Sequence, residues 1–330
     1  VKLSLAEPDS VELQFAVGGL FRDKGEMQRA LAVHQGLLDK PDLTSVERNR
    51  AVLAVGQDFF KSGMYDRAEE FLKRVGGKEY VSEALSLLMD LYVNQNDWIQ
   101  AIEVARKLQA TTVESKRVEV AHFMVEIALS YQEKEDYNQA QDWLYKAIDE
   151  NPIAPRPRVV LGDLLKVQGR YHEAVHEWVK LEEYASDYLG LIVGSLIECH
   201  DRLGTRKQCL EKLKEIIKVV PNHDLLEATF NLSFELEGHE ASRELARQFL
   251  KKTSNITWAI PILELIKNDS SESYLDDVNL LIQVTKHHAQ DAGHVCGKCG
   301  FQAQAHYWRC PACRLLDTYV PSSFQVGVNA

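Results

Sequence analysis

Apolar and turn-forming positions recur along most of the chain in a pattern typical of paired helices. Each unit has a small or apolar residue, a large residue three places later, a turn residue four places after that, and a small residue five places further on. Six sets of residues fit this pattern: Gly18, Phe21, Gly25 and Ala30; Gly56, Phe59, Gly63 and Ala68; Met89, Tyr92, Asn96 and Ala101; Ala128, Tyr131, Glu135 and Ala140; Gly162, Leu165, Gly169 and Ala174; Ile197, His200, Gly204 and Cys209. The pattern predicts an all-α chain of successive helix–turn–helix units.

The spacing of these units is close to that of a known repeat. The small residue in fourth place falls at positions 30, 68, 101, 140, 174 and 209, so successive units are 38, 33, 39, 34 and 35 residues apart. These intervals cluster on the 34-residue period of the tetratricopeptide repeat (TPR), which the chain resembles position by position. In such repeats a small residue lets two helices cross closely, and the large residue fills the gap between neighbouring repeats. The resemblance implies a TPR-type α-solenoid whose concave surface binds peptides or partner proteins.

The last part of the chain departs from this pattern. Residues 225–252 are expected to form a seventh, degenerate repeat, in which Gly238 fits the turn position but Arg243 stands in the small place. Two further helical stretches follow, separated by the turn sequence NDSSES. We therefore expect three parts: a TPR solenoid of about seven repeats over 1–255, capping or connecting helices over 256–290, and a small rubredoxin-like or zinc-ribbon metal module over 291–330.

Composition and charge narrow the functional class. The chain has 38 Lys and Arg against 49 Asp and Glu, a formal net charge of −11, which argues against a general binder of nucleic-acid phosphates. No apolar run is long enough to span a bilayer, and the first residues do not form a signal peptide. The sequence contains no Gly-rich phosphate loop, no H-E-x-x-H and no G-x-S-x-G. We therefore expect a protein that is not an enzyme and does not bind nucleic acid.

Two closely spaced cysteine pairs mark the C-terminal module. Cys296 and Cys299, followed by Cys310 and Cys313, make the spacing C-x₂-C-x₁₀-C-x₂-C. A gap of two residues puts both sulfurs of a pair on one side of a tight turn, so four thiolates can complete a tetrahedral metal site. Gly300, directly after the first pair, permits the positive φ that such a turn needs. The spacing predicts one ion, Zn²⁺ or Fe, bound by all four cysteines.

Other cysteine chemistries fit the sequence less well. A thioredoxin-type C-x-x-C stands at the head of a helix in a larger α/β unit, and a disulfide-rich scaffold spreads its cysteines through the fold. Cys199 and Cys209 fall in helical, apolar sequence and are interpreted as buried small residues. His294 and His306 are interpreted as surface or neighbouring residues rather than ligands, because four cysteines already complete the site.

The module has little apolar sequence and is expected to fold only around its metal. Phe301, Tyr307 and Trp308 supply either its packing or a docking face. The net negative charge of four thiolates around a divalent ion is offset by three basic residues: Lys298, Arg309 and Arg314.

Two alternative functions remain open at this level. Gly300 and Pro311 stand in the paired loops as in rubredoxins, so a rubredoxin-like electron carrier is one alternative. A nucleic-acid-binding TPR and zinc-ribbon protein that stacks bases on Tyr307 and Trp308 is the other.

The C-x₂-C turns at Cys296–Cys299 and Cys310–Cys313 are called the first and second knuckle below. The order of the repeats and the two knuckles, together with the segment CGKCGF…YWRCPACR, resembles the lipopolysaccharide assembly protein B family of Gram-negative bacteria. The resemblance covers essentially the whole chain, and one departure is Leu316 in place of an aromatic residue after the last knuckle. It implies the four-cysteine site at Cys296, Cys299, Cys310 and Cys313, and an adaptor anchored in the inner membrane by an N-terminal helix not included in this chain, which begins at Val1. It also implies that the adaptor acts on the cytoplasmic side, where it promotes degradation of the lipid A deacetylase LpxC by the AAA+ protease FtsH. An inner-membrane protein that senses lipopolysaccharide is expected to restrain it.

Overall fold

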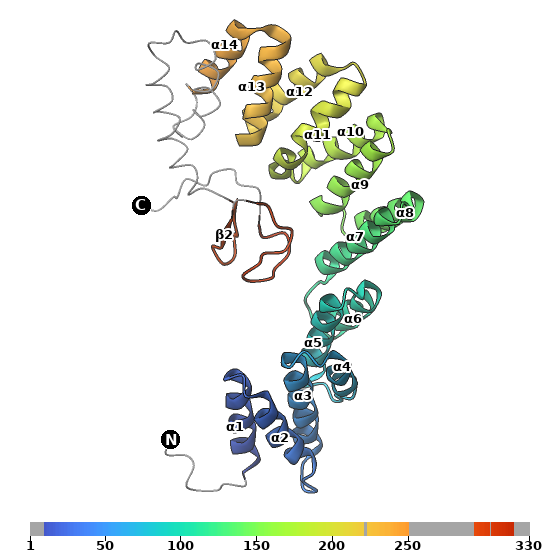
Figure 1. Cartoon of the computed structure of the whole chain (residues 1–330), viewed down its shortest axis with the longest axis vertical. Coiled ribbons are helices and arrows are strands. Elements are labelled where there is room, and N and C mark those ends of the chain that lie inside the picture. Colours follow the sequence, from blue (N-terminus) through green and yellow to red (C-terminus); the bar gives the residue numbers. More distant parts are fainter. Residues whose placement is uncertain (1–9, 221–222, 251–293, 304, 320–330) are drawn as a thin grey trace. The chain divides into compact units, whose positions relative to one another are not determined.

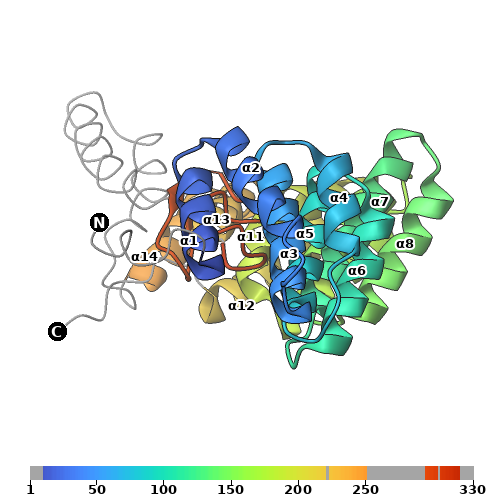
Figure 2. The ribbon, with the colours of Figure 1, turned by 90° about the horizontal axis from the view of Figure 1, so that it is seen from below.

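The structure of this protein is a computed structural model, which describes residues 10–220, 223–250, 294–303 and 305–319. The chain divides into two compact units, Val1–Ile127 and Ala128–Ala330, with the boundary inside a helix. The helices follow one another in pairs joined by short turns (Figure 1), and Figure 2 gives a second view of the same pairs. The all-α fold of TPR type with a small C-terminal four-cysteine module is therefore confirmed.

The first unit contains three helix pairs and most of the next helix. The helices are α1 (Val11–Asp23), α2 (Met27–Leu38), α3 (Ser45–Lys61), α4 (Tyr65–Lys73), α5 (Val81–Asn94), α6 (Trp98–Thr111) and α7 (Arg117–Glu133), which crosses the unit boundary. α1 packs on α2, α3 on α4 and α5 on α6, and each pair also contacts the next through α2 with α3 and α4 with α5. A continuous run of helix–helix contacts follows from stacking these pairs in order.

The second unit continues the series and ends in the small module. Its elements are α8 (Tyr137–Glu150), α9 (Pro155–Val167), α10 (Tyr171–Val179), the 3₁₀ helices η2 (Lys180–Glu183) and η3 (Ser186–Tyr188), α11 (Leu189–Arg202), α12 (Arg206–Val219), α13 (His223–Glu237), α14 (His239–Leu250), β1 (His294–Val295) and β2 (Gln302–Ala303). The two short strands pair antiparallel, with His294 opposite Ala303 and Val295 opposite Gln302. Among the described residues, no helix has the length and apolar composition needed to cross a bilayer.

The turn inside each helix pair has the same backbone geometry. Each turn residue identified in the sequence has a positive φ: 78° at Gly25, 73° at Gly63, 58° at Asn96, 60° at Glu135, 75° at Gly169 and 68° at Gly204. The next residue then donates its N–H to the carbonyl of the large residue five places earlier, as Glu26 does to Phe21 and Arg170 does to Leu165, both at 2.9 Å. These bonds satisfy carbonyls that a helix end leaves unpaired, which explains why the turn position recurs.

The helices of each pair cross where small residues were expected. The fourth position is fully buried in every unit: Ala30, Ala68, Ala101, Ala140 and Ala174 are 0% exposed, and Cys209 is 1% exposed. Four places later, the side chain of the second helix faces the first position of the pattern. A Cβ at Gly18 would lie 2.3 Å from His34 Nε2, and a Cβ at Gly162 would lie 2.1 Å from Trp178 Nε1. Because no Cβ tolerates contacts this short, these two crossings require glycine.

The C-terminal helix pair differs from the others. α13 and α14 form a hairpin around Gly238, whose φ is 89°. Ser242 is buried there, and its hydroxyl donates to the carbonyl of Phe230 at 2.9 Å. This polar contact joins the two helices of the pair. The helices expected over 256–290 lie outside the described residues.

Candidate metal centre

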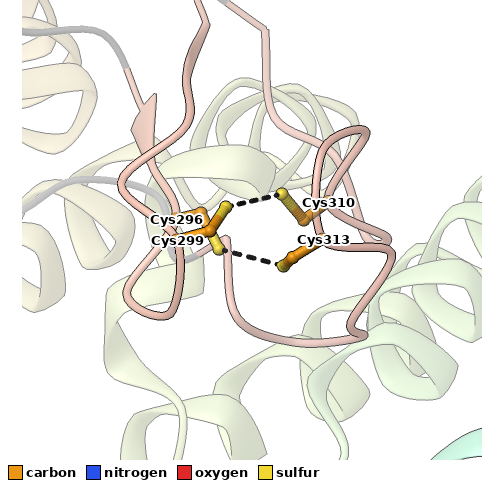
Figure 3. Close-up of side chains that lie close together, drawn as sticks. All are labelled: Cys296, Cys299, Cys310 and Cys313. Carbon is orange, nitrogen blue, oxygen red and sulfur yellow. Dashed lines mark hydrogen bonds between the residues drawn. The ribbon is translucent and has the colours of Figure 1, made fainter. Parts of the chain in front are cut away.

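The four cysteines of the two knuckles converge on one point. Their sulfurs all lie within 4.8 Å of one another, and among the described residues no other group of three or more Cys, His, Asp or Glu meets this condition. Cys296 Sγ is 3.7 Å from Cys313 Sγ, and Cys299 Sγ is 3.6 Å from Cys310 Sγ (Figure 3). A tetrahedral site with metal–sulfur bonds of about 2.3 Å has sulfurs about 3.8 Å apart, whereas a disulfide bond is about 2 Å long. The spacing fits a metal and excludes a disulfide here.

Each cysteine pair is held by the same turn. In the first knuckle Gly300 donates its N–H to the Cys296 carbonyl and Cys296 donates to the Phe301 carbonyl, both at 2.9 Å. In the second, Arg314 donates to the Cys310 carbonyl at 2.8 Å and Cys310 to the Leu315 carbonyl at 2.9 Å. Gly300 has the positive φ expected from the sequence, 74°, and Arg314 adopts 61° without being glycine. The two knuckles thus share the same pattern of backbone hydrogen bonds around their cysteines.

The pKa values of the site thiols are shifted in both directions, unlike those of the buried helical thiols. Desolvation acts to raise the pKa of Cys296, but hydrogen bonds with Thr318 and with the backbone N–H groups of Cys299 and Lys298 outweigh it, and the pKa falls to about 6. At Cys299 a backbone hydrogen bond with Phe301 acts to lower the pKa, but desolvation and hydrogen bonds with the other three cysteines outweigh it, and the pKa rises to about 11. Burial instead raises the pKa of both Cys199 and Cys209 to about 11. A metal binds thiolates, which Cys296 forms most readily of these four cysteines, whereas the helical cysteines stay protonated.

Aromatic residues complete the small core around the sulfurs. Cys296, Cys310 and Tyr319 are buried together, and Phe301 packs against them. Tyr319 donates its hydroxyl to the Ala303 carbonyl at 3.2 Å. Sequence reasoning identified Phe301 but missed Tyr319, which is 0% exposed. The only sequence feature that pointed to its burial was its position shortly after the second knuckle.

Of the three aromatic residues expected to supply packing or a docking face, Trp308 contacts the helices. Its ring stacks on Tyr188 of η3 with centroids 5.4 Å apart and planes 2° from parallel. The Arg156 guanidinium, at the start of α9, lies 6.0 Å from the centroid of the same ring. Tyr307 is 42% exposed and contacts Tyr319 within the module. Trp308 therefore joins the module to the helices.

The two histidines near the site lie among these rings. His306 meets Trp308 edge-on at 4.6 Å and Tyr188 edge-on at 5.8 Å. Burial, reinforced by the neighbouring His294, lowers the pKa of His306 to about 4, so its ring is neutral near pH 7. Neither histidine belongs to the group of four sulfurs. His306 fills space at the module's contact with η3, and His294 packs edge-on against His306 at 5.8 Å within the module.

Together these features define a protein of TPR-type helix pairs that carries a C-terminal rubredoxin-type metal-binding module. The model of a family described as "Rubredoxin metal binding domain" matches residues 294–321, and a tetratricopeptide repeat model matches residues 121–153, which cover most of α7 and α8.

Curated relatives extend this similarity to the whole chain. Lipopolysaccharide assembly protein B of Escherichia coli K12 is 26% identical over 315 residues, which are 94% of this chain and 81% of the relative. The protein of the same name from Haemophilus influenzae is 27% identical over 318 residues, 95% of this chain and 80% of the relative. A solved tetratricopeptide repeat protein from Parabacteroides merdae is 13% identical, with a TM-score of 0.34 over 84% of this chain and 98% of its own. The resemblance to the lipopolysaccharide assembly protein B family is confirmed by the two relatives of that name.

Proposed function

We propose that this protein is a non-enzymatic adaptor that regulates lipopolysaccharide synthesis at the cytoplasmic side of the inner membrane. In this role it would bring the deacetylase LpxC to the membrane protease FtsH and be restrained by a lipopolysaccharide-sensing membrane protein. The observation that carries the proposal is the four-cysteine module joined to TPR-type helices, in a chain of which 94–95% aligns with relatives named lipopolysaccharide assembly protein B.

An adaptor of this kind needs surfaces that bind other proteins and no catalytic group. Helix pairs offer many exposed side chains on a rigid frame, which suits the binding of protein segments. Holding a substrate beside a protease raises its local concentration, so degradation accelerates without a reactive group in the adaptor. The proposal therefore assigns no catalytic residue.

The metal's role in this proposal is structural. Cys296, Cys299, Cys310 and Cys313 would hold one Zn²⁺ or Fe ion, and four protein ligands leave no open position for a substrate. The ion would fix the two knuckles against each other and thereby hold Trp308 in its place on Tyr188. Metal analysis of the purified protein distinguishes the two ions.

One observation favours a second candidate function. Cys299 is exposed, and an exposed ligand sulfur gives electrons a short path to a bound iron. A rubredoxin-like electron carrier would show a visible spectrum that changes reversibly on reduction, whereas a zinc site would show none.

The adaptor proposal is tested by co-purification from membranes. We expect the tagged full-length protein to retain both the protease and the deacetylase, and the deacetylase to persist longer in cells depleted of the adaptor. Cys310→Ser should weaken retention by disrupting the module, and Cys199→Ser, a buried cysteine outside the site, serves as the matched control. Failure of the wild-type protein to associate with either partner, in membranes and in detergent, contradicts the proposal.

A further inference from the structure

The four sulfurs of the metal centre differ in their exposure to solvent. Cys299 is exposed and Cys313 is partly exposed. Cys296 and Cys310 are buried, at 2% and 0% exposure. Each knuckle therefore contributes one outer sulfur and one inner sulfur. A small reagent dissolved in water reaches Cys299 more readily than the other three cysteines.

Across the two knuckles, each outer sulfur lies close to an inner one. Cys299 Sγ is 3.6 Å from Cys310 Sγ. Cys296 Sγ is 3.7 Å from Cys313 Sγ. A disulfide bond is about 2 Å long, so either pair has to approach by about 1.6–1.7 Å to form one. The exposed Cys299 thus has a buried sulfur beside it to which it can be joined.

Cys299 is a thiolate whenever the site is loaded, because a thiol that binds a metal is deprotonated. The thiolate is also the form of cysteine that attacks an oxidant. Zn²⁺ has no redox chemistry of its own, so in a zinc-loaded site the sulfurs supply the electrons. Cys199 and Cys209 differ in both respects, since they are 0% and 1% exposed and lie outside the four-sulfur group.

We propose that Cys299 is an oxidation site for hydrogen peroxide, and that Cys310 then forms a disulfide with it and so releases the metal. In the first step the Cys299 thiolate attacks one peroxide oxygen: an S–O bond forms, the O–O bond breaks, and hydroxide leaves. In the second step the Cys310 thiolate attacks the resulting sulfenic acid: an S–S bond forms, the S–O bond breaks, and a second hydroxide leaves. The two sulfurs together lose two electrons, and one peroxide is reduced to two hydroxides.

The disulfide removes two of the four ligands from the site. The remaining pair, Cys296 and Cys313, cannot complete a tetrahedral site, so the ion dissociates and the module is expected to unfold. Trp308 then leaves Tyr188, which is 6% exposed while the two rings are stacked with centroids 5.4 Å apart. Oxidation would therefore uncover an aromatic surface of η3. This response lies beyond the adaptor function proposed above and does not depend on it.

Titration of the zinc-loaded full chain with hydrogen peroxide tests the proposal without any partner protein. A chromogenic chelator measures the released Zn²⁺, and mass spectrometry after alkylation maps the oxidised cysteines. We expect complete loss of zinc and a disulfide between Cys299 and Cys310. Cys299 should be oxidised at least about tenfold faster than Cys199 or Cys209. A dithiol reductant added together with Zn²⁺ should restore the loaded protein, because the disulfide is a reversible product.

The matched control replaces both helical cysteines, as Cys199→Ala and Cys209→Ala. Alanine stands at the place of Cys209 in the other five units, so this small residue suits the helix crossing. The double variant keeps all four sulfurs of the module, and circular dichroism checks that its helices are intact. It should release zinc at the same rate as the wild type.

Trp308→Leu separates the oxidation from its effect on the helices. Trp308 is not a ligand, so the variant should bind zinc and lose it to peroxide as the wild type does. In the wild type, hydrogen exchange at η3 should become faster on oxidation, because Tyr188 is uncovered. In the variant this exchange is already fast, and oxidation should not change it further.

Four results overturn the proposal. One is zinc that stays bound after peroxide treatment, and another is oxidation of Cys199 or Cys209 at the same rate as Cys299. A first disulfide between Cys296 and Cys299 contradicts the part assigned to Cys310. Loss of zinc without faster exchange at η3 in the wild type contradicts the release of the module from the helices.

Discussion

The helix pairs and the metal module repeat the same kind of turn but close their cores differently. In both, a tight turn ends at a residue of positive φ, such as Gly169 in the helices and Gly300 in the first knuckle. In the helix pairs the turn brings together large buried side chains, among them Trp178 and Leu164, both 0% exposed. In the module it brings together four sulfurs, with Tyr319 as the one large side chain that is fully buried in its described part. Side-chain burial can therefore stabilise the helices alone, whereas we expect the module to depend on an ion.

Removal of the metal should produce the largest difference between the two regions. Binding of a structural zinc by four ligands is worth on the order of 10–16 kcal/mol at neutral pH, far more than the small module's apolar core can supply. Chelation, or Cys310→Ser, is expected to unfold the module and leave the helical circular dichroism signal nearly unchanged. Hydrogen exchange resolved by segment would show rapid exchange of residues 294–319 and protection of α3–α12. A large loss of helical signal on chelation would contradict the independence of the helices.

Asp58→Ala should give the next largest effect, because a buried ion pair with a hydrogen bond to His34 joins the first two helix pairs beside their apolar cluster. Asp58 is 0% exposed and binds both His34 and Arg22. Breaking a buried ionic group by removing one partner costs about 3–5 kcal/mol. Urea unfolding followed by circular dichroism would measure the loss, and Asp42→Ala in an exposed loop should change the free energy of unfolding by less than about 0.5 kcal/mol. Equal effects of the two variants would mean that the ionic group does not hold the first and second pairs together.

Gly162→Ala tests the apolar crossing of the fifth unit. The added methyl would collide with Trp178, which is buried and donates its indole N–H to the Val159 carbonyl at 3.2 Å. Overpacking of this kind costs about 1–3 kcal/mol. Gly194→Ala is the matched control, since its added methyl meets no atom within 4 Å and alanine favours a helix over glycine by up to about 1 kcal/mol. Opposite changes in the free energy of unfolding are therefore expected for the two variants.

A second substitution sharpens the same test. Gly162→Ala combined with Trp178→Leu reproduces the pair found at the fourth crossing, where Ala128 stands in first position and Leu144 is 0% exposed. The double variant should lose less stability than the sum of the two single variants, because the smaller side chain makes room for the methyl. Additive losses would show that the crossing is not limited by the size of this pair.

The same comparison explains what could be predicted from the sequence. The turns and knuckles were predictable because their residues are neighbours in sequence, so a fixed spacing such as C-x₂-C reports their geometry directly. Asn96 and Glu135 were identified as turn residues by the spacing of the repeated helix pattern, even though they are not glycine. The Asp58–His34–Arg22 group was not predicted, because it joins three helices and its members follow no local pattern.

The contact between Trp308 and Tyr188 was unpredictable for the same reason. The two residues lie far apart in the sequence, and nothing beside Tyr188 in the chain signals that an aromatic ring will stack on it. The sequence suggested only that three aromatic residues of the module, Phe301, Tyr307 and Trp308, supply either its packing or a docking face.

Tyr188→Leu and Trp308→Leu should give the smallest effect and bear most directly on how the two regions are coupled. The stacked pair contributes about 0.5–1.5 kcal/mol beyond its buried area, and neither residue belongs to the four-sulfur site or to a helix-pair crossing. Each variant is expected to keep its metal and its helical signal while the backbone around η3 and His306 exchanges hydrogen faster. Because both variants remove the same contact, the double variant should lose little more than either single one. Tyr307→Leu, whose ring contacts Tyr319 within the module, should leave exchange at η3 unchanged. If the losses in the double variant are additive, the ring stack does not couple the module to the helices, and the two regions are independent in binding as well as in folding.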